Sequence, residues 1–248
     1  MSAGPGAAGA AGELGALPPA IVVPPPGPRS RELSRRIAAA EAPGVNTLVG
    51  DAPSLFWQEA AGANVVDVDG NRFVDLASGF GVAAIGHRHP RVVAAIRDQA
   101  GRLIHGLGDV HPHPLRVELA ERLAARLAVA RGADGARIHF GISGAEAVEI
   151  AVKTAVLATG RSAVVAFEPS YHGLTAGALA LTSRPAFRRP FAAHLHPHVV
   201  RLPYGGEPAA VAARLAVGDV AAGVVEPSVG REGVLLPPPG WLAATAEA

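Results

Sequence analysis

The sequence contains no cysteine, one methionine and one lysine, Lys153. The absence of cysteine excludes disulfides and thiolate metal ligands, and it is compatible with a reducing cytoplasm. Aromatic residues are also scarce, and the hydrophobic content of 49% consists mostly of alanine and valine, which predicts closely packed Ala-rich helices. No apolar run approaches the roughly 20 residues that a membrane helix needs. We therefore expect a cytoplasmic globular protein that does not enter a membrane.

Neither sign of charge is in excess, since 22 basic and 21 acidic residues give a net charge of +1. No basic run is interleaved with aromatic residues, so the sequence predicts no nucleic-acid surface. The histidines occur partly in pairs, in "GHRHP", "VHPHP" and "HLHPH", and paired imidazoles are good metal ligands. The H-E-x-x-H pattern is absent and proline interrupts two of these clusters. We predict no metal site, and a metal-dependent hydrolase is the weakest of the alternatives.

The first part of the chain has an unusual composition, "MSAGPGAAGAAGELGALPPAIVVPPPGPRS". It lacks the basic start and apolar core of a signal peptide, and "PPPGP" favours an extended, unpaired backbone. We expect residues 1–28 to be a disordered or loosely attached arm. Residues 29–105 are predicted to form an N-terminal segment with a helix at its start, a β-hairpin around Asp69 and Gly70, and a helix that begins at Pro90.

From residue 106 onward the sequence favours alternating helices and strands. The first helix places four leucines on one face, and such a stripe is typical of core packing. Strands separated by helical patterns indicate a mostly parallel sheet with helices on both faces, an α/β fold. The leucines are Leu115, Leu119, Leu123 and Leu127; the strands are 137–140, 163–168, 199–203 and 220–226; helices begin near Ser143, Gly173 and Glu207.

A candidate ligand site begins with the stretch "RIHFGISGAEAVEIAVKTAVLATG". Ser143 and Glu146 have the spacing of a capping box, which fixes the start of a helix. The N–H groups of Gly144 and Ala145 then face outward at the positive end of the helix dipole, an arrangement that suits a phosphate. The stretch is neither a Walker loop nor a G-x-G-x-x-G loop. An ordinary capped helix is the alternative that the spacing leaves open.

Two further stretches place polar groups after predicted strands, "AFEPSYHGLTAGALALTS" and "GVVEPSVGREGVLLPPPGW". Ligands of open α/β sheets bind at the carboxyl ends of strands, where Tyr171, His172 and Glu226 are expected. An aromatic ring beside a phosphate site suits a flat, phosphorylated heterocycle. The alternatives are that Tyr171 packs against a helix start, that His172 is a satisfied polar residue and that Glu226 is a structural carboxylate.

In this order and spacing, the stretches between Phe56 and Trp241 resemble the class III aminotransferases, enzymes that depend on pyridoxal phosphate and have fold type I. The motifs include "DVDGNRFVDLASGFGVAAIGHRHPRV", "ISGAEAVEIAVK", "VVAFEPSYHGLT" and "GVVEPSVGREGVLLPPPGW". The resemblance implies a three-layer fold with an incomplete sheet, in which residues 106–248 form the first half of the large domain. It also implies a pyridoxal phosphate cofactor, transfer of an amino group from an amino acid or amine to a 2-oxo acid, and a homodimer for the full-length protein.

The resemblance also assigns roles to residues. The two residues at a helix start bind the cofactor phosphate, an aromatic ring stacks on the pyridine ring, and an acidic residue lies near the reacting centre. The implied residues are Ser143, Gly144, Ala145, Tyr171 and His172 for the cofactor, Glu226 for catalysis, and Ser78, Phe80 and Arg231 for the substrate.

Several positions depart from the family pattern. Leu174 replaces an arginine that binds a substrate carboxylate in the acetylornithine-type enzymes, which argues against an acetylornithine substrate. In "EPSVGRE", Arg231 replaces a glutamate of the family's "EPxQGE" and is a candidate carboxylate clamp. A solvent-exposed arginine without this role is the alternative.

The Schiff-base lysine of the family is expected downstream of this sequence. Lys153 cannot replace it, because ten helical residues place it about 15 Å from Ser143. We therefore expect an N-terminal portion that is inactive alone. A non-catalytic module that binds phosphate ligands is the alternative.

Overall fold

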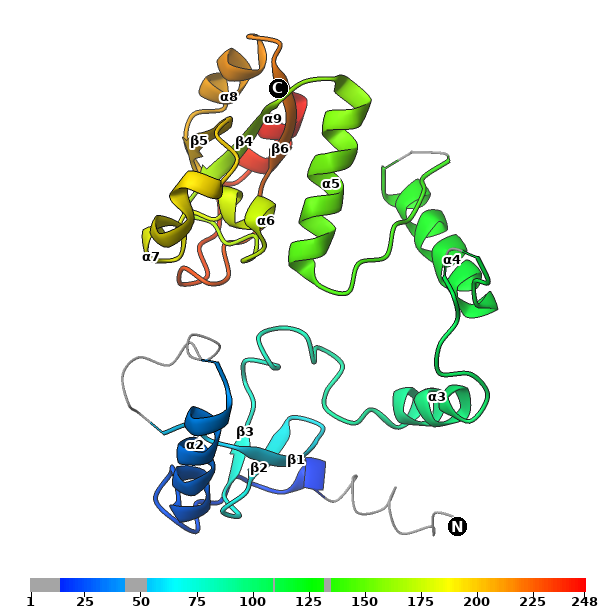
Figure 1. Cartoon of the computed structure of the whole chain (residues 1–248), viewed down its shortest axis with the longest axis vertical. Helices are drawn as coiled ribbons and strands as arrows, with labels where there is room; N and C mark the ends of the chain where they lie inside the picture. The colour runs from blue at the N-terminus through cyan, green and yellow to red at the C-terminus, as the bar shows by residue number, and fades with distance from the viewer. Residues whose placement is uncertain (1–13, 43–52, 109, 132–134) are drawn as a thin grey trace. The chain divides into compact units, whose positions relative to one another are not determined.

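The computed structural model describes residues 14–42, 53–108, 110–131 and 135–248. The chain divides into two compact units, Met1–Pro112 and His113–Ala248, and each is described by itself (Figure 1). None of the helices in the described ranges has the length and apolar character needed to cross a membrane.

The first unit is built on a three-stranded antiparallel sheet in the order β1-β2-β3. The predicted hairpin is confirmed: its turn is closed by the buried carboxylate of Asp67, which accepts the N–H groups of Asp69 and Asn71 at 2.9 and 2.8 Å. Strand β1 was not predicted. The elements of this unit are α2 (Pro28–Ala40), β1 (Trp57–Ala61), β2 (Asn64–Asp67), β3 (Arg72–Val74) and α3 (Pro90–Ala100).

The prediction of a disordered arm is wrong from Leu14 onward; the preceding residues lie outside the described ranges. Nδ2 of Asn64 donates hydrogen bonds of 2.7 Å to the carbonyl oxygens of Leu14 and Leu17. Oδ1 of Asn71 accepts the N–H of Val22 at 2.9 Å. Both asparagines are buried. The arm is therefore attached to the hairpin by side chains that its own composition does not reveal.

The second unit contains a three-stranded parallel sheet in the order β5-β4-β6. Its strands are β4 (Ala163–Glu168), β5 (Val199–Pro203) and β6 (Val220–Val224), and its helices are α4 (Pro114–Arg131), α5 (Gly144–Thr159), α6 (Ala176–Leu181), α7 (Pro185–Arg188), α8 (Pro208–Leu215) and α9 (Trp241–Glu247), with a 3-10 helix, η1 (Arg189–His194).

The central strand β4 is covered on both faces, as Figure 1 shows. Val165 and Phe167 pack toward Trp241 of α9, in a cluster that also includes a residue of α8. The alternate residue Val164 packs with Leu181 of α6 and with side chains of α5. This period of two follows from the pleat of a strand. The predicted three-layer α/β arrangement is confirmed.

Two expectations for this unit are wrong. Residues 137–140 form no strand, because a strand exists through pairing and no strand of the described ranges pairs with them. The leucine stripe of α4 does not lie in a core: Leu115 and Leu119 are 50% and 48% exposed, and no described element covers them. A periodic pattern specifies an apolar face but not the surface that covers it.

Candidate functional site

The first part of the candidate site is the start of α5. Ser143 has an extended backbone and its Oγ accepts the N–H of Glu146 at 3.1 Å, while the Glu146 carboxylate accepts the N–H of Ile142. The first amides of a helix have no partner within the helix. A Cβ added at Gly144 would have no atom within 4 Å, so the space beside Gly144 is open. The capping prediction is confirmed, and an anion can approach the helix start.

The second part is the loop after β4, which carries Tyr171 and His172. Oγ1 of the fully buried Thr182 accepts the N–H groups of His172 and Gly173 at 2.9 and 3.3 Å. The same hydroxyl lies 3.0 Å from the carbonyl oxygen of Gly173, to which it donates. One side chain therefore satisfies the backbone of this loop and fixes its conformation.

Gly173 brings these two parts together. Its φ of +133° is in a region that other residues rarely adopt, and a Cβ there would lie 2.6 Å from Cβ of Ala145. Only glycine permits the loop to approach α5 so closely. The Tyr171 loop therefore lies directly against the helix start that carries Gly144.

Glu226 links the segment that follows β6 to the loop that carries Tyr171. Its Oε1 accepts the N–H of Tyr171 at 2.7 Å, and its Oε2 accepts the N–H of Gly230 at 3.4 Å. The hydroxyl of Tyr204, the residue that follows β5, donates to the carbonyl oxygen of Pro227 at 3.1 Å. The segment that follows β6 is thus fixed to the loops that follow β4 and β5.

His172 has an unusual environment. Burial lowers its pKa below the ordinary histidine value, and the charge of Arg201 adds to this, whereas Glu226 acts in the opposite direction. The neutral imidazole is therefore favoured. Its Nε2 is buried and has no hydrogen-bond partner within the described ranges. Because such atoms are costly, this nitrogen suits a polar ligand atom.

Arg231 lies over the aromatic ring of the site. Its guanidinium carbon is 4.5 Å from the Tyr171 ring centroid and 5.7 Å from that of Phe187. The two rings meet edge to face, with centroids 6.5 Å apart. The Tyr171 face that was predicted to hold a flat ligand is therefore in contact with a cation.

Glu149 is a contributor that the sequence analysis missed. Its Oε1 accepts hydrogen bonds from Oγ1 of Thr175 and from the N–H of Gly177, both at 2.7 Å, and so links α5 to the start of α6. Burial alone raises the pKa of Glu149, but these hydrogen bonds and the charge of Lys153 outweigh it and lower the pKa. Lys153 itself is exposed on α5. No local pattern identifies Glu149 or Thr182, because their partners are distant in sequence.

The remaining predicted residues, Ser78 and Phe80, belong to the first unit. Both have a positive φ, of 48° and 60°, and Phe80 is 96% exposed. The base of their loop is fixed by Asp75, which accepts the N–H of Gly79 and the ring nitrogen of His87, each at 2.8 Å. The hydrogen bond from His87 lowers the pKa of Asp75, although burial acts against it.

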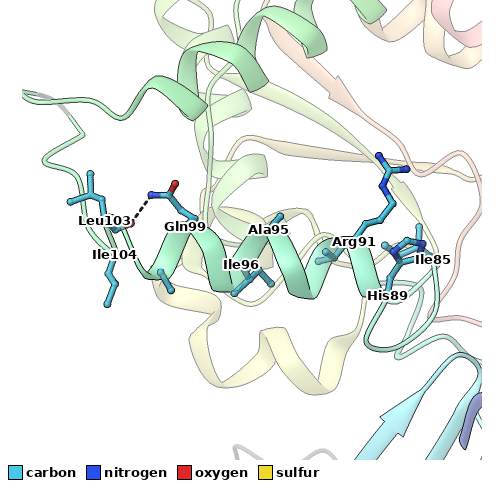
Figure 2. A pocket seen from close by; sticks show the side chains of 10 residues that line it. Ile85, His89, Arg91, Ala95, Ile96, Gln99, Leu103 and Ile104 are labelled. Carbon is cyan, nitrogen blue, oxygen red and sulfur yellow. Dashed lines mark hydrogen bonds between the residues drawn. The ribbon is translucent and has the colours of Figure 1, made fainter. Parts of the chain in front are cut away.

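The first unit also contains an apolar hollow along α3, which Figure 2 shows. Val92 and Ile96 line it, Arg91 lies at one end, and Gln99 donates to the carbonyl oxygen of Leu103 at the other. Its lining is mostly apolar, with His89, Arg91 and Gln99 as its polar members, so the candidate site remains the loop cluster of the second unit. Within the described ranges, no three histidine, aspartate or glutamate side chains gather as a metal site.

Comparisons with known proteins bear on this geometry. The family described as Aminotransferase class-III matches residues 48–248. Acetylornithine aminotransferase of Mycobacterium leprae (strain TN) is 41% identical over 196 residues, which cover 79% of this chain and 46% of that protein. 4-Aminobutyrate aminotransferase of Mycobacterium bovis (strain ATCC BAA-935 / AF2122/97) is 37% identical over 245 residues, covering 90% of this chain and 53% of that protein.

Two solved structures have the same fold. Ornithine aminotransferase from Toxoplasma gondii ME49 gives a TM-score of 0.74 at 26% identity, covering 88% of this chain and 50% of that chain. Taurine:2-oxoglutarate aminotransferase from Bifidobacterium kashiwanohense, solved in complex with PLP and glutamate, gives 0.74 at 25% identity, covering 88% and 52%.

The second unit therefore has the α/β fold of the fold type I transferases, with three loops gathered beside one sheet edge. The chain belongs to the class III aminotransferase family, as its sequence motifs predicted. It spans about half the length of the curated relatives that it matches.

Proposed function

We propose that this chain provides the phosphate- and ring-binding part of a pyridoxal-phosphate-dependent aminotransferase that passes an amino group from an amino acid or amine to a 2-oxo acid. The observation that carries this proposal is the contact of Gly173 with Ala145, which brings an open helix start and an aromatic loop together. Family membership supports the reaction class.

The residues fit the cofactor in three respects. The N–H groups of Gly144 and Ala145, with Oγ of Ser143, bind the phosphate at the positive end of α5. The Tyr171 ring orients the pyridine ring. The unpartnered Nε2 of His172 gains a polar neighbour from the ligand. When bound, the cofactor supplies the electron sink for bond changes at the amino carbon.

Glu226 serves this site through position and charge. Because its carboxylate binds the N–H of Tyr171, it holds the aromatic ring in place. It also favours the protonated form of the neighbouring His172. We propose that Ser78 and Phe80 of the first unit contact the substrate, as the family resemblance implies; both have a positive φ, and strained backbone often occurs at functional positions.

Lys153 does not form the covalent bond to the cofactor in this proposal. It is exposed on α5 and its charge acts on Glu149. The chain alone then binds pyridoxal phosphate reversibly and does not turn over substrate. We propose further that the complete protein is a homodimer of the cytoplasm, a compartment that suits a sequence without cysteine.

A titration with pyridoxal phosphate tests this function, followed by absorbance with and without borohydride and by mass spectrometry. We expect saturable binding that inorganic phosphate competes and no stoichiometric adduct. A stoichiometric, reducible adduct on Lys153 would contradict the proposal.

A pair of variants tests the phosphate site. Gly144→Pro removes one N–H at the first helical position, where proline is tolerated, and the extended Ser143 suits a following proline. Loss of one charge-assisted hydrogen bond weakens binding of pyridoxal phosphate about tenfold or more. Gly144→Ala keeps the N–H and its methyl group meets no protein atom within 4 Å, so its loss of affinity should be smaller than that of Gly144→Pro. Equal affinities for both variants would place the phosphate elsewhere.

A further inference from the structure

We infer that Arg231 determines substrate specificity by binding a substrate carboxylate, and that this site therefore selects amino acids over simple amines. The inference rests on the proposed function, since it assumes that the ligand ring binds at Tyr171. It begins from the contact of the Arg231 guanidinium with the Tyr171 ring at 4.5 Å.

The loop that carries Arg231 is held in a defined position. Val229 and Leu235 form two backbone hydrogen bonds with each other, of 2.9 and 3.0 Å, and Val229 is fully buried. The adjacent Glu232 binds Nε of Arg184 at 2.6 Å. Arg231 therefore lies in a loop that is held by the Val229–Leu235 backbone pair and by the ion pair of Glu232 with Arg184.

The carboxylates nearest to Arg231 along the chain are engaged elsewhere. Glu232 binds Arg184, and both oxygens of Glu226 accept backbone N–H groups. Within the described ranges Arg231 is exposed and forms no hydrogen bond or ion pair, and its guanidinium lies over the two aromatic rings. Its guanidinium therefore retains donors for an anion from outside the chain.

The chemistry of the guanidinium favours a carboxylate. Its planar fork matches a carboxylate with two parallel hydrogen bonds, and stacking on a ring fixes the plane of the fork. A flat ligand ring that stacks on the same face of Tyr171 would displace the guanidinium. The guanidinium would then lie beside the ligand ring, next to the substituent that the ring carries. Leu174 has no charge and therefore cannot bind a substrate carboxylate.

Stable conjugates test the inference without any covalent step on the protein. The probes are the phosphopyridoxyl conjugates of L-alanine and 4-aminobutyrate, compared with those of ethylamine and propylamine, which lack only the carboxylate. Calorimetry on the chain should show tighter binding of at least one acid conjugate than of its amine partner, by about tenfold, as expected for a charge-assisted pair. Comparing the two acids shows whether an α-carboxylate or a distal carboxylate is recognised.

Variants connect this preference to Arg231. In Arg231→Gln the ratio between acid and amine conjugates should fall to about one, while the amine conjugates bind as well as before or better, because the ring face is freed. Arg231→Lys should keep part of the preference, because it keeps the charge. Arg126→Gln, at an exposed position of α4, is the matched control and should leave the ratio unchanged.

The outcomes separate this inference from the proposed function. If the wild type binds all four conjugates equally well, the function stands and the inference is wrong. If the preference survives in Arg231→Gln, another group recognises the carboxylate and the inference is also wrong. If no conjugate binds, the proposed function fails and the inference falls with it.

Discussion

The backbone N–H of Tyr171 donates a hydrogen bond of 2.7 Å to Oε1 of Glu226, although 55 residues separate them in the sequence. The bond connects the loop after β4 with the segment after β6, two neighbouring strands of the sheet. A single carboxylate thereby positions the aromatic ring and acts against the larger effect of burial, which lowers the pKa of His172.

Gly173→Ala should destabilise the second unit and weaken binding of pyridoxal phosphate. The new methyl group would meet Ala145 at 2.6 Å in a backbone conformation that alanine rarely adopts. Strain and overpacking of this kind cost about 1–3 kcal/mol each. Gly218→Ala is the control, since Gly218 also has a positive φ but faces open space. Urea unfolding should show a larger loss for Gly173→Ala; equal losses would mean that only backbone strain matters.

Thr182→Val should lower the free energy of unfolding by about 1–3 kcal/mol, because one buried and one partly buried N–H group lose their acceptor. Those groups belong to His172 and Gly173. Thr154→Val makes the same change on the exposed face of α5, where the hydroxyl donates to a helix carbonyl, and should stay within about 0.5 kcal/mol. Denaturant unfolding measures both, and a neutral Thr182→Val would show that the loop does not depend on this hydroxyl.

His172 should make the stability of the protein pH-dependent. Because burial lowers its pKa in the folded state, the unfolded chain binds more protons once the pH falls below the ordinary histidine pKa of about 6.5. The free energy of unfolding therefore decreases as the pH falls through this range, by at most about 1.4 kcal/mol per pH unit. Unfolding curves at a series of pH values measure this slope.

His172→Gln should reduce the slope, whereas His139→Gln, at an exposed position, should leave it unchanged. Glu226→Gln should lower the pKa of His172 further in an NMR titration, since the carboxylate favours the charged imidazole. An unchanged slope in His172→Gln would assign the pH dependence to other groups.

Glu149→Ala should loosen α6, because the carboxylate accepts the N–H of Gly177 at the helix start. Loss of a helix cap costs about 0.5–2 kcal/mol. Since its pKa is lowered, the contribution of Glu149 is present above the ordinary carboxyl pKa and is lost as the pH falls through the lowered value. Glu118→Ala, at an exposed position of α4 paired with Arg122, is the control. Thermal unfolding at neutral pH should separate the two variants.

Much of the local structure follows from the sequence alone. The apolar run of β4, the turn at Gly70 and the cap at Ser143 are confirmed because their signals lie within a few residues. The family motifs also predicted the family and the fold. By contrast, the arm from Leu14 onward and the missing strand at 137–140 could not be predicted, because pairing depends on partners elsewhere in the chain.

The candidate site likewise combines chemical groups that the sequence predicts with contacts that only the tertiary structure reveals. The sequence by itself determined which chemical groups are available: helix N–H groups at Gly144, an aromatic ring at Tyr171 and a carboxylate at Glu226. Only the tertiary structure decided that Gly173 packs against Ala145 and that Arg231 covers the Tyr171 ring. Capping and strand propensity act over a few residues, whereas these contacts arise from parallel strands that bring distant loops to one edge of a sheet.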